Sequence, residues 1–289
     1  MIASENHLMI RCWGVRGSVP TAEKDKLRVG GNTASVAIRY GVEPLVIIDG
    51  GTGLRLLSKE LRSTETEPLT ATILFSHFHW DHIQGVPFFE PIYSEHTRLK
   101  MYSGVPASTL EDILRTQMSQ PYFPVPFSSA QAACEYNQIG SAGVQIGSLS
   151  VRPVQLNHPG GAFGYRINSP AGSLIYVCDH EHGAPEIDEG IYREAANADV
   201  LVYDAHFTPA EYVKCKGWGH STWYEGAQLA RRANVGKLLL FHHSPSRTDQ
   251  QVQEILREAR QEFAGTEAAH ENRIICLSGA KSKAVPVGR

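Results

Sequence analysis

Short apolar runs separated by Gly, Pro and Asn dominate both halves of the chain. Runs of this length that are rich in β-branched and aromatic residues are typical of strands. They predict strands over residues 8–13, 33–40, 44–49, 71–76, 98–102, 149–156, 162–168, 173–178, 199–203 and 237–241. The segment INSPAGSLIYV predicts two of these strands joined by a Pro-Gly turn.

Helix-forming segments lie between these strands. They predict helices near residues 53–62, 106–118, 221–233 and 248–263. In the second helix, Ser108 is a possible N-cap. In the third, Thr222 and Glu225 have the spacing of a capping box. The same spacing recurs between Thr248 and Gln251 in the fourth. Because strands alternate with helices in both halves, the sequence predicts an α/β architecture in which helices cover sheets.

Several predicted strands end in a polar residue that can bind a ligand. These residues are Asp49, His77, Asp179, Asp204, His206, His242 and His243. In α/β sheets, functional sites form beyond the carboxyl ends of the strands. We therefore expect these endings to converge on one rim of the fold.

The chain of 289 residues shows no clear domain boundary and no low-complexity linker. We expect a single domain over residues 1–289, with an aromatic, Pro-rich insertion around 103–140. Three aromatic residues of the insertion are Tyr122, Phe123 and Phe127. They could stack on a base or form a hydrophobic plug, and the sequence does not choose between these roles.

The bulk properties exclude several classes of protein. A net charge of −3 argues against a broad basic face, so any contact with nucleic acid would be local. Five cysteines without a C-x-x-C pair are typical of reduced thiols, and they predict a cytoplasmic protein. The first residues lack the pattern of a signal peptide, and no apolar run approaches the roughly 20 residues of a membrane helix. No membrane association is therefore expected.

The strongest chemical signal in the chain is the segment SHFHWDHIQG, residues 76–85. It carries the potential ligands His77, His79, Asp81 and His82. Imidazole and carboxylate are ligands that Zn²⁺ prefers, and Mn²⁺ and Fe²⁺ accept them too. Candidates for the remaining ligands are His158, Asp179 and His242. Because no cysteine is among them, a structural zinc site of the cysteine type is not expected.

The pattern H-x-H-x-D-H, followed by distant His, Asp and His, resembles the metallo-β-lactamase superfamily. The resemblance implies an αβ/βα four-layer sandwich, in which two mixed β-sheets are flanked by helices. It also implies two divalent metal ions, most simply Zn²⁺, with Mn²⁺ or Fe²⁺ as alternatives. One ion would be held by His77, His79 and His158. The other would be held by Asp81, His82 and His242, with Asp179 bridging the two.

The resemblance separates these ligands from neighbouring histidines. His180 and His182 match no ligand of the superfamily, so we expect them behind the ligands or on the surface. His243 competes with His242, but the alignment of the segment FHHSP with the superfamily favours His242. Ordinary surface histidines are expected at His7, His96 and His270.

Two later segments resemble the ribonuclease Z branch of the superfamily. Residues 204–207, DAHF, resemble a segment that carries a carboxylate, and residues 219–222, GHST, resemble its Gly-His-Ser-Thr motif. In that family the histidine pairs with the carboxylate, which implies a pair of His220 and Asp204. The chain shows no Gly/Pro-rich arm of the kind that grips tRNA, so long structured RNA is not expected as a partner. A homodimer is expected by resemblance alone.

The resemblance implies a phosphodiesterase that acts on a cyclic nucleotide or a short nucleic-acid-like diester. Two ions would turn water into hydroxide at neutral pH, and Asp81 or Asp179 could accept its proton. His220, held by Asp204, would protonate the leaving oxygen. Asp49 would orient a ligand, or it would only form a turn before two glycines.

Other activities stay open at this point. A thioester or lactone hydrolase on the same fold would not need an acid such as His220, because a thiolate leaves readily. A di-iron oxygen reductase would require an attached flavin module, and no remaining stretch is large enough for one. A nucleotide-binding protein without turnover is a further alternative. Arg16 and Arg55 could contact a phosphate, but the sequence does not place them.

Overall fold

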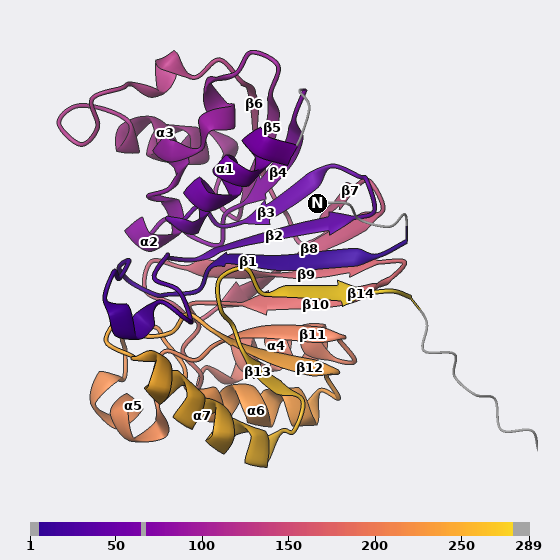
Figure 1. Cartoon of the computed structure of the whole chain (residues 1–289). Coiled ribbons are helices and arrows are strands. Elements are labelled where there is room, and N and C mark those ends of the chain that lie inside the picture. The colour runs from indigo at the N-terminus through magenta and orange to yellow at the C-terminus, as the bar shows by residue number, and fades with distance from the viewer. Residues whose placement is uncertain (1–5, 65–67, 280–289) are drawn as a thin grey trace, which may run out of the picture.

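The computed structural model describes residues 6–64 and 68–279. Within these ranges the strands form two seven-stranded mixed sheets that pack face to face, and helices cover the outer face of each sheet (Figure 1). The architecture is therefore the expected αβ/βα sandwich of four layers.

The first sheet comes mainly from the N-terminal half of the chain. Its strands, in spatial order, are β14 (Ile274–Leu277), β1 (Leu8–Gly14), β2 (Ser35–Tyr40), β3 (Leu45–Ile48), β4 (Thr70–Leu74), β5 (Arg98–Ser103) and β6 (Ala133–Gln138). The strands from β3 to β6 are parallel, and β14, β1, β2 and β3 pair antiparallel. The helices of this half are α1 (Gly53–Thr64), α2 (Trp80–Ile83) and α3 (Ala107–Gln117). Short 3₁₀ turns are η1 (Lys24–Lys26), η2 (Val86–Phe88), η3 (Glu90–Tyr93) and η4 (Phe127–Ser129).

The second sheet comes from the C-terminal half. Its strands, in spatial order, are β13 (Thr266–Ala268), β12 (Lys237–Phe241), β11 (Val200–Asp204), β10 (Gly172–Val177), β9 (Ala162–Ser169), β8 (Leu149–Leu156) and β7 (Val144–Ile146). The strands from β10 to β13 are parallel, and the strands from β7 to β10 pair antiparallel. The helices are α4 (Pro185–Ala195), α5 (Pro209–Cys215), α6 (Trp223–Arg232) and α7 (Asp249–Glu262).

Three apolar clusters hold the layers together. One lies between the sheets, where Ile10 and Ile48 of the first sheet meet Tyr176 and Leu239 of the second. A second lies between the first sheet and helices α1 and α3, and a third lies between the second sheet and helices α4, α6 and α7. Central strands are buried on both faces, which explains why β3 reads LVII without alternation.

Every strand predicted from the sequence is present, with ends that differ by at most two residues. The strands β6, β7, β13 and β14 were not predicted, because they are short or polar and lie at or near sheet edges. The Pro-Gly turn joins β9 and β10 as predicted.

The four predicted helices are present, but α2, α4 and α5 were not predicted. Thr222 accepts a hydrogen bond from the backbone N–H of Glu225, and Thr248 and Gln251 form a complete capping box. The predicted cap at Ser108 is wrong. The helix begins at Ala107 after Pro106, so Ser108 already lies inside its first turn.

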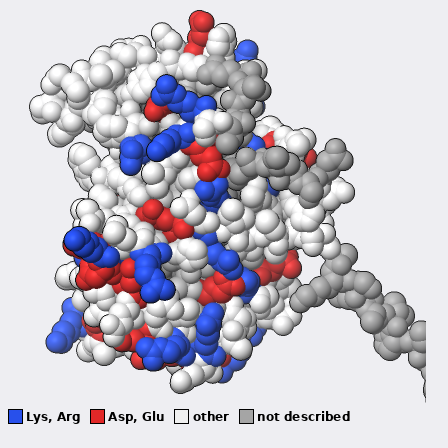
Figure 2. Space-filling model, viewed as in Figure 1, with Lys and Arg blue, Asp and Glu red and all other residues white. Residues whose placement is uncertain are grey.

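The segment 103–140 supplies α3 and the edge strand β6. Its three aromatic residues differ in environment, because Phe127 is buried in the core while Tyr122 is exposed. On the face shown in Figure 2, positive and negative side chains are interspersed over the lower half, without a broad basic area. Among the residues that the structure describes, no helix has the length and apolar character needed to cross a bilayer.

Candidate metal centre

The candidate ligands gather where strands of both sheets end. Asp49 follows β3 and His77 follows β4, in the first sheet. Asp179 and His242 follow β10 and β12, in the second sheet. The expected convergence of strand endings on one rim is therefore present in the fold.

A first group of side chains contains three histidines. The nitrogen atoms of His77, His79 and His158 lie within 4.8 Å of one another. One oxygen of Asp179, Oδ1, lies 3.9 Å from His77 Nε2 and 3.7 Å from His158 Nε2. These four residues match the group that the sequence assigns to one ion.

A second group surrounds the other oxygen of Asp179. Its Oδ2 lies 3.0 Å from His82 Nε2 and 3.2 Å from His242 Nε2. Asp81 completes the group, with its Oδ2 3.2 Å from His242 Nε2. The two oxygens of Asp179 thus face different groups, which is the arrangement that a bridging carboxylate requires.

The chemistry of these donors suits divalent cations. His77 Nε2 is buried and has no hydrogen-bond partner in the described part of the chain. Burial and the positive charge of the His82 imidazolium hold the pKa of His77 well below its usual value. The imidazole of His77 is therefore neutral and can bind a cation. Burial also lowers the pKa of His82, but Asp179, Asp81 and Asp49 outweigh it and raise that pKa well above its usual value. The centre therefore attracts positive charge.

Neighbouring groups fix the orientation of several candidate ligands. Asp49 is fully buried and lies 2.8 Å from His82 Nδ1, as expected for a residue that orients a histidine. The carbonyl oxygen of Gly219 lies 2.7 Å from His158 Nδ1. The hydroxyl of Ser76 lies 3.0 Å from His77 Nδ1. The Nε2 atoms of these three rings are the ones that lie near the other candidate ligands.

The backbone is strained at three of these strand endings. Asp49, Asp179 and His242 have φ angles of 62°, 59° and 56°. Residues other than glycine rarely adopt positive φ, and such strain clusters at functional sites. Here the left-handed turn sends each side chain back toward the centre directly after its strand.

The predicted pair of His220 and Asp204 is close to both groups. His220 Nδ1 lies 2.9 Å from Asp204 Oδ2 and 3.7 Å from Asp179 Oδ1. The His220 ring centroid lies 5.4 Å from that of His158 and 5.1 Å from that of His242. Burial disfavours the charged imidazole, but Asp204 overcomes this and raises the pKa of His220 to about 9. The group can therefore donate a proton at neutral pH.

Two further residues support this pair: His206, which the sequence marked only as a polar strand ending, and Glu181, which sequence reasoning missed. His206 stacks on His220 with a centroid distance of 4.4 Å and an angle of 14°, and burial lowers its pKa to about 3. Glu181 is buried and accepts hydrogen bonds from the backbone N–H groups of Gly217 and Gly219, both at 2.7 Å. The role of His206 could have been found from its position beside Asp204. For Glu181 the sequence gives no signal, because its partners lie far along the chain.

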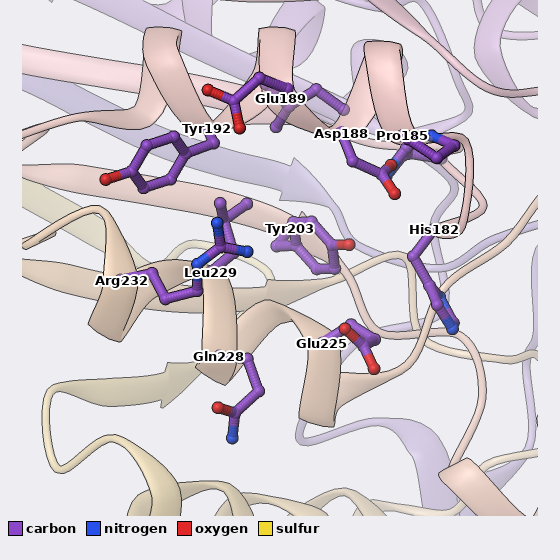
Figure 3. A pocket seen from close by; sticks show the side chains of 12 residues that line it. His182, Pro185, Asp188, Glu189, Tyr192, Tyr203, Glu225, Gln228, Leu229 and Arg232 are labelled. Carbon is purple, nitrogen blue, oxygen red and sulfur yellow. The ribbon is translucent and has the colours of Figure 1, made fainter.

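Other histidines lie outside the two groups. His180 pairs with Asp188 at 3.1 Å, and His182 lies 2.8 Å from the Ser221 hydroxyl. Both line a separate cavity of about 350 Å³ between α4 and α6, where Figure 3 shows His182 facing Glu225. This agrees with the expectation that they lie behind the ligands.

His243 points away from the centre and lies 3.0 Å from the carbonyl oxygen of Ala269, which leaves His242 in the ligand position.

The two arginines considered for phosphate contacts also lie apart from the centre. Arg16 is fully buried and donates to backbone carbonyl groups, including that of Gly30 at 2.7 Å. Arg55 is exposed on α1.

Known proteins share this fold and parts of this sequence. The chain is 25% identical to ribonuclease Z of Thermoplasma acidophilum, over 90% of this chain and 94% of that protein. Its structure is similar to the metallo-β-lactamase fold protein YhfI from Bacillus subtilis, with a TM-score of 0.71 and 18% identity over 94% of this chain and 99% of that one. It is also similar to a diphosphatase from the PhnP family, with a TM-score of 0.69 and 19% identity over 93% and 99% of the two chains.

A family match covers the segment that carries the candidate ligands. Residues 45–243, more than half of the chain, match the β-lactamase superfamily domain. This range begins before His77 and includes His242. Together with the two mixed sheets and their outer helices, the match confirms the resemblance inferred from the sequence. The chain therefore belongs to the β-lactamase superfamily.

Proposed function

We propose that the protein is a metal-dependent hydrolase that cleaves a small phosphodiester, such as a cyclic nucleotide or a short nucleic-acid-like diester. Hydrolysis of phosphodiester bonds is supported by the similarity to ribonuclease Z and to the PhnP-family diphosphatase. The observation that carries the proposal is the pair of His220 and Asp204, 2.9 Å apart, beside the carboxylate of Asp179.

The residues of the centre would hold two cations. His77, His79 and His158 would hold one, Asp81, His82 and His242 the other, and the two oxygens of Asp179 would serve both. When bound, two divalent cations neutralise the charge of the phosphate oxygens and lower the pKa of a water molecule between them. Zn²⁺ fits these nitrogen and oxygen donors, and Mn²⁺ and Fe²⁺ are alternatives.

The side chains of the centre would then move two protons. As the water oxygen forms its bond to phosphorus, Asp81 or Asp179 accepts the water proton. As the bond between phosphorus and the leaving oxygen breaks, His220 donates the proton on its Nε2 to that oxygen. Asp204 accepts the hydrogen bond from Nδ1 of His220 and keeps the ring in this orientation.

The partly buried acid, His220, favours a phosphodiester over a thioester. An alkoxide leaves slowly unless it is protonated, whereas a thiolate leaves readily on its own. Because the carboxylate of Asp204 raises the pKa of His220 against the effect of burial, the imidazole carries its proton at neutral pH. A proton donor in this position speeds the departure of a poor leaving group such as an alkoxide, and it has little effect on the departure of a good one such as a thiolate.

The test compares two diesters that differ in leaving group. Enzyme loaded with Zn²⁺ or Mn²⁺ should hydrolyse both bis(p-nitrophenyl) phosphate and a dinucleotide. Replacing His220 by Ala should slow dinucleotide cleavage by roughly 10²–10⁴-fold, the usual contribution of a general acid. The p-nitrophenyl diester should be affected much less, because p-nitrophenolate leaves without a proton.

Controls separate this role from metal binding. The metal content of His220→Ala should stay unchanged, and His96→Ala, at an exposed position, should behave like the unmodified protein. Equal losses of metal and of turnover would contradict the acid role. Thioester turnover far above diester turnover would favour a thioester hydrolase instead.

A longer RNA belongs in the same assay because of the similarity to ribonuclease Z. The proposed homodimer can be measured by light scattering on the same sample.

A further inference from the structure

A small pocket lies between the helices α2 and α3 of the N-terminal half. Its volume is about 230 Å³. It is lined by Trp80, Ile83, Ile113, Thr116, Gln117 and Tyr122. None of these six side chains carries a charge. The volume is several times that of one water molecule, which occupies ~30 Å³ in the liquid. The pocket can therefore take a flat ring.

The pocket shares the helix α2 with the candidate metal centre. Trp80 stands between His79 and Asp81, two candidate ligands. Asp81 and the following His82 are buried, whereas 65% of Trp80 is exposed. Trp80 and Ile83 are three positions apart on α2, so they lie on the same side of its single turn. Two residues that line the pocket thus stand on the same short helix as two candidate ligands.

The walls of the pocket are held in place without a ligand. The side-chain Nε2 of Gln117, on α3, donates a hydrogen bond of 2.8 Å to the carbonyl oxygen of Ile83. The backbone N–H of Tyr122 donates to the carbonyl oxygen of Ser119, also at 2.8 Å. On the same loop, Phe123 packs edge-on against Phe88 with a centroid distance of 5.7 Å. The two exposed rings, Trp80 and Tyr122, are therefore presented on a fixed frame.

The segment that follows α3 is also without charge. The sequence has no Lys, Arg, Asp or Glu from residue 116 to 134. Figure 2 shows the corresponding lobe, around α3 and the loop after it, as an almost uninterrupted uncharged surface. A contiguous uncharged surface with large exposed aromatic side chains often marks a binding site. Phe127 does not belong to this set, because it is buried in the core.

From this geometry we propose that the pocket binds the base of a nucleoside phosphodiester, on the part of the substrate that stays attached to phosphate. The inference rests on the proposed function. A nucleobase is flat and uncharged and stacks on aromatic rings such as those of Trp80 and Tyr122. A charged group would lose its hydration there without gaining a partner. The leaving group belongs on the side of His220, which comes from the C-terminal half.

The experiment uses two substrates with one leaving group. Thymidine 5′-(p-nitrophenyl phosphate) and methyl p-nitrophenyl phosphate differ in the group that stays attached to phosphate, which is a nucleoside with its base in the first and a methyl group in the second. For the metal-loaded protein, kcat/KM should be higher for the thymidine ester. In Tyr122→Ala the ratio of the two kcat/KM values should fall about tenfold, within the effect of removing a stacking ring. The methyl ester itself should be hydrolysed as before.

Two control variants locate the effect. Tyr122→Phe keeps the ring and should keep the ratio. Tyr224→Ala removes a partly exposed tyrosine on α6, outside the pocket, and should also keep it. Because 63% of Tyr122 is exposed, its removal should leave the fold intact.

Several results would overturn the inference. If the ratio of the two kcat/KM values were unchanged in Tyr122→Ala, with both esters still hydrolysed, the pocket would not bind the base, and the proposed function would be unaffected. No hydrolysis of either ester by the unmodified protein would overturn the proposed function, and the inference with it. A change from dimer to monomer in Tyr122→Ala, with equal losses for both esters, would instead identify this face as an interface between two copies of the chain.

Discussion

At the scale of single residues, Asp49 is a buried carboxylate that supports the candidate centre from behind His82. Its carboxylate accepts hydrogen bonds from the backbone N–H of Ser76 at 2.8 Å and from the Ser76 hydroxyl at 2.9 Å. It also accepts from the Tyr176 hydroxyl at 2.9 Å and lies 2.8 Å from His82 Nδ1. A buried carboxylate with this many donors is fully satisfied, so it holds His82 in one orientation and strengthens it as a ligand.

Replacing Asp49 by Asn should therefore weaken metal binding. The loss expected for a residue that orients a ligand histidine is roughly 10–100-fold in affinity. The loss of affinity should affect the cation held by Asp81, His82 and His242. A competition titration with a chelating dye should therefore show one of the two metal-binding steps at a lower affinity. Asp199→Asn is the matched control, since Asp199 bonds to Ser173 before β11 and lies outside the centre. A uniform loss at both steps would contradict the role of Asp49.

The sequence was sufficient to name the candidate ligands and some of their supporting groups, but not the contacts made by Glu181. The residues from His77 to His82 could be predicted because four potential ligands stand at short fixed spacing. His242 could be predicted because it ends an apolar strand. Glu181 could not, since its hydrogen bonds to Gly217 and Gly219 exist only after distant parts of the chain meet. Local pattern specifies ligands, whereas tertiary contact specifies their orientation.

At the scale of elements, the loop between α5 and α6 is organised around one carboxylate. Glu181 accepts hydrogen bonds from Gly217 and Gly219 and from the Tyr212 hydroxyl at 3.0 Å. These donors hold the pKa of Glu181 below its usual value, although burial opposes them. The carbonyl group of Gly219 meets His158, and His220 follows directly. One side chain thus positions a candidate ligand and the candidate acid.

Replacing Glu181 by Gln should loosen this loop. The amide can accept only through its oxygen, so a backbone N–H group of Gly217 or Gly219 loses its partner, at a cost of about 1–3 kcal/mol if it is the buried group of Gly219. We expect a lower free energy of unfolding, faster hydrogen exchange over residues 216–221, and a lower kcat on a dinucleotide. Glu189→Gln, on the exposed side of α4, is the control. Unchanged exchange in that loop would show that Glu181 does not position it.

Element boundaries followed from burial more than from propensity. The strand β3 is apolar throughout and β12 is apolar after Lys237, and both could be predicted because both of their faces are covered. The strand β6 reads ACEYNQ and lies at the edge of the first sheet, where pairing alone makes it a strand. The helix α4 begins with Pro185 and contains Gly190, so its local signal is weak and its packing on β8 and β10 sustains it. Tertiary packing decided these cases.

At the scale of the whole molecule, the candidate centre is a link between the two sheets. His77, His79, Asp81 and His82 come from the segment after β4 of the first sheet. The other candidate ligands, His158, Asp179 and His242, follow strands β8, β10 and β12 of the second sheet. Cations bound here would tie together halves that otherwise meet through an apolar interface. Binding to the folded state alone must then stabilise both halves.

Removing the cations should therefore destabilise the two halves together. At a free metal concentration of 100 times Kd, each site adds ~2.7 kcal/mol to the free energy of unfolding. After chelation we expect a lower Tm, with hydrogen exchange rising both in the segment after β4 and in the segments after β10 and β12. The same treatment of His77→Ala should shift the Tm by less, because one group has lost a donor. If exchange rose in one half alone, the cations would not bridge the sheets, and the assignment of Asp179 as the shared carboxylate would fail.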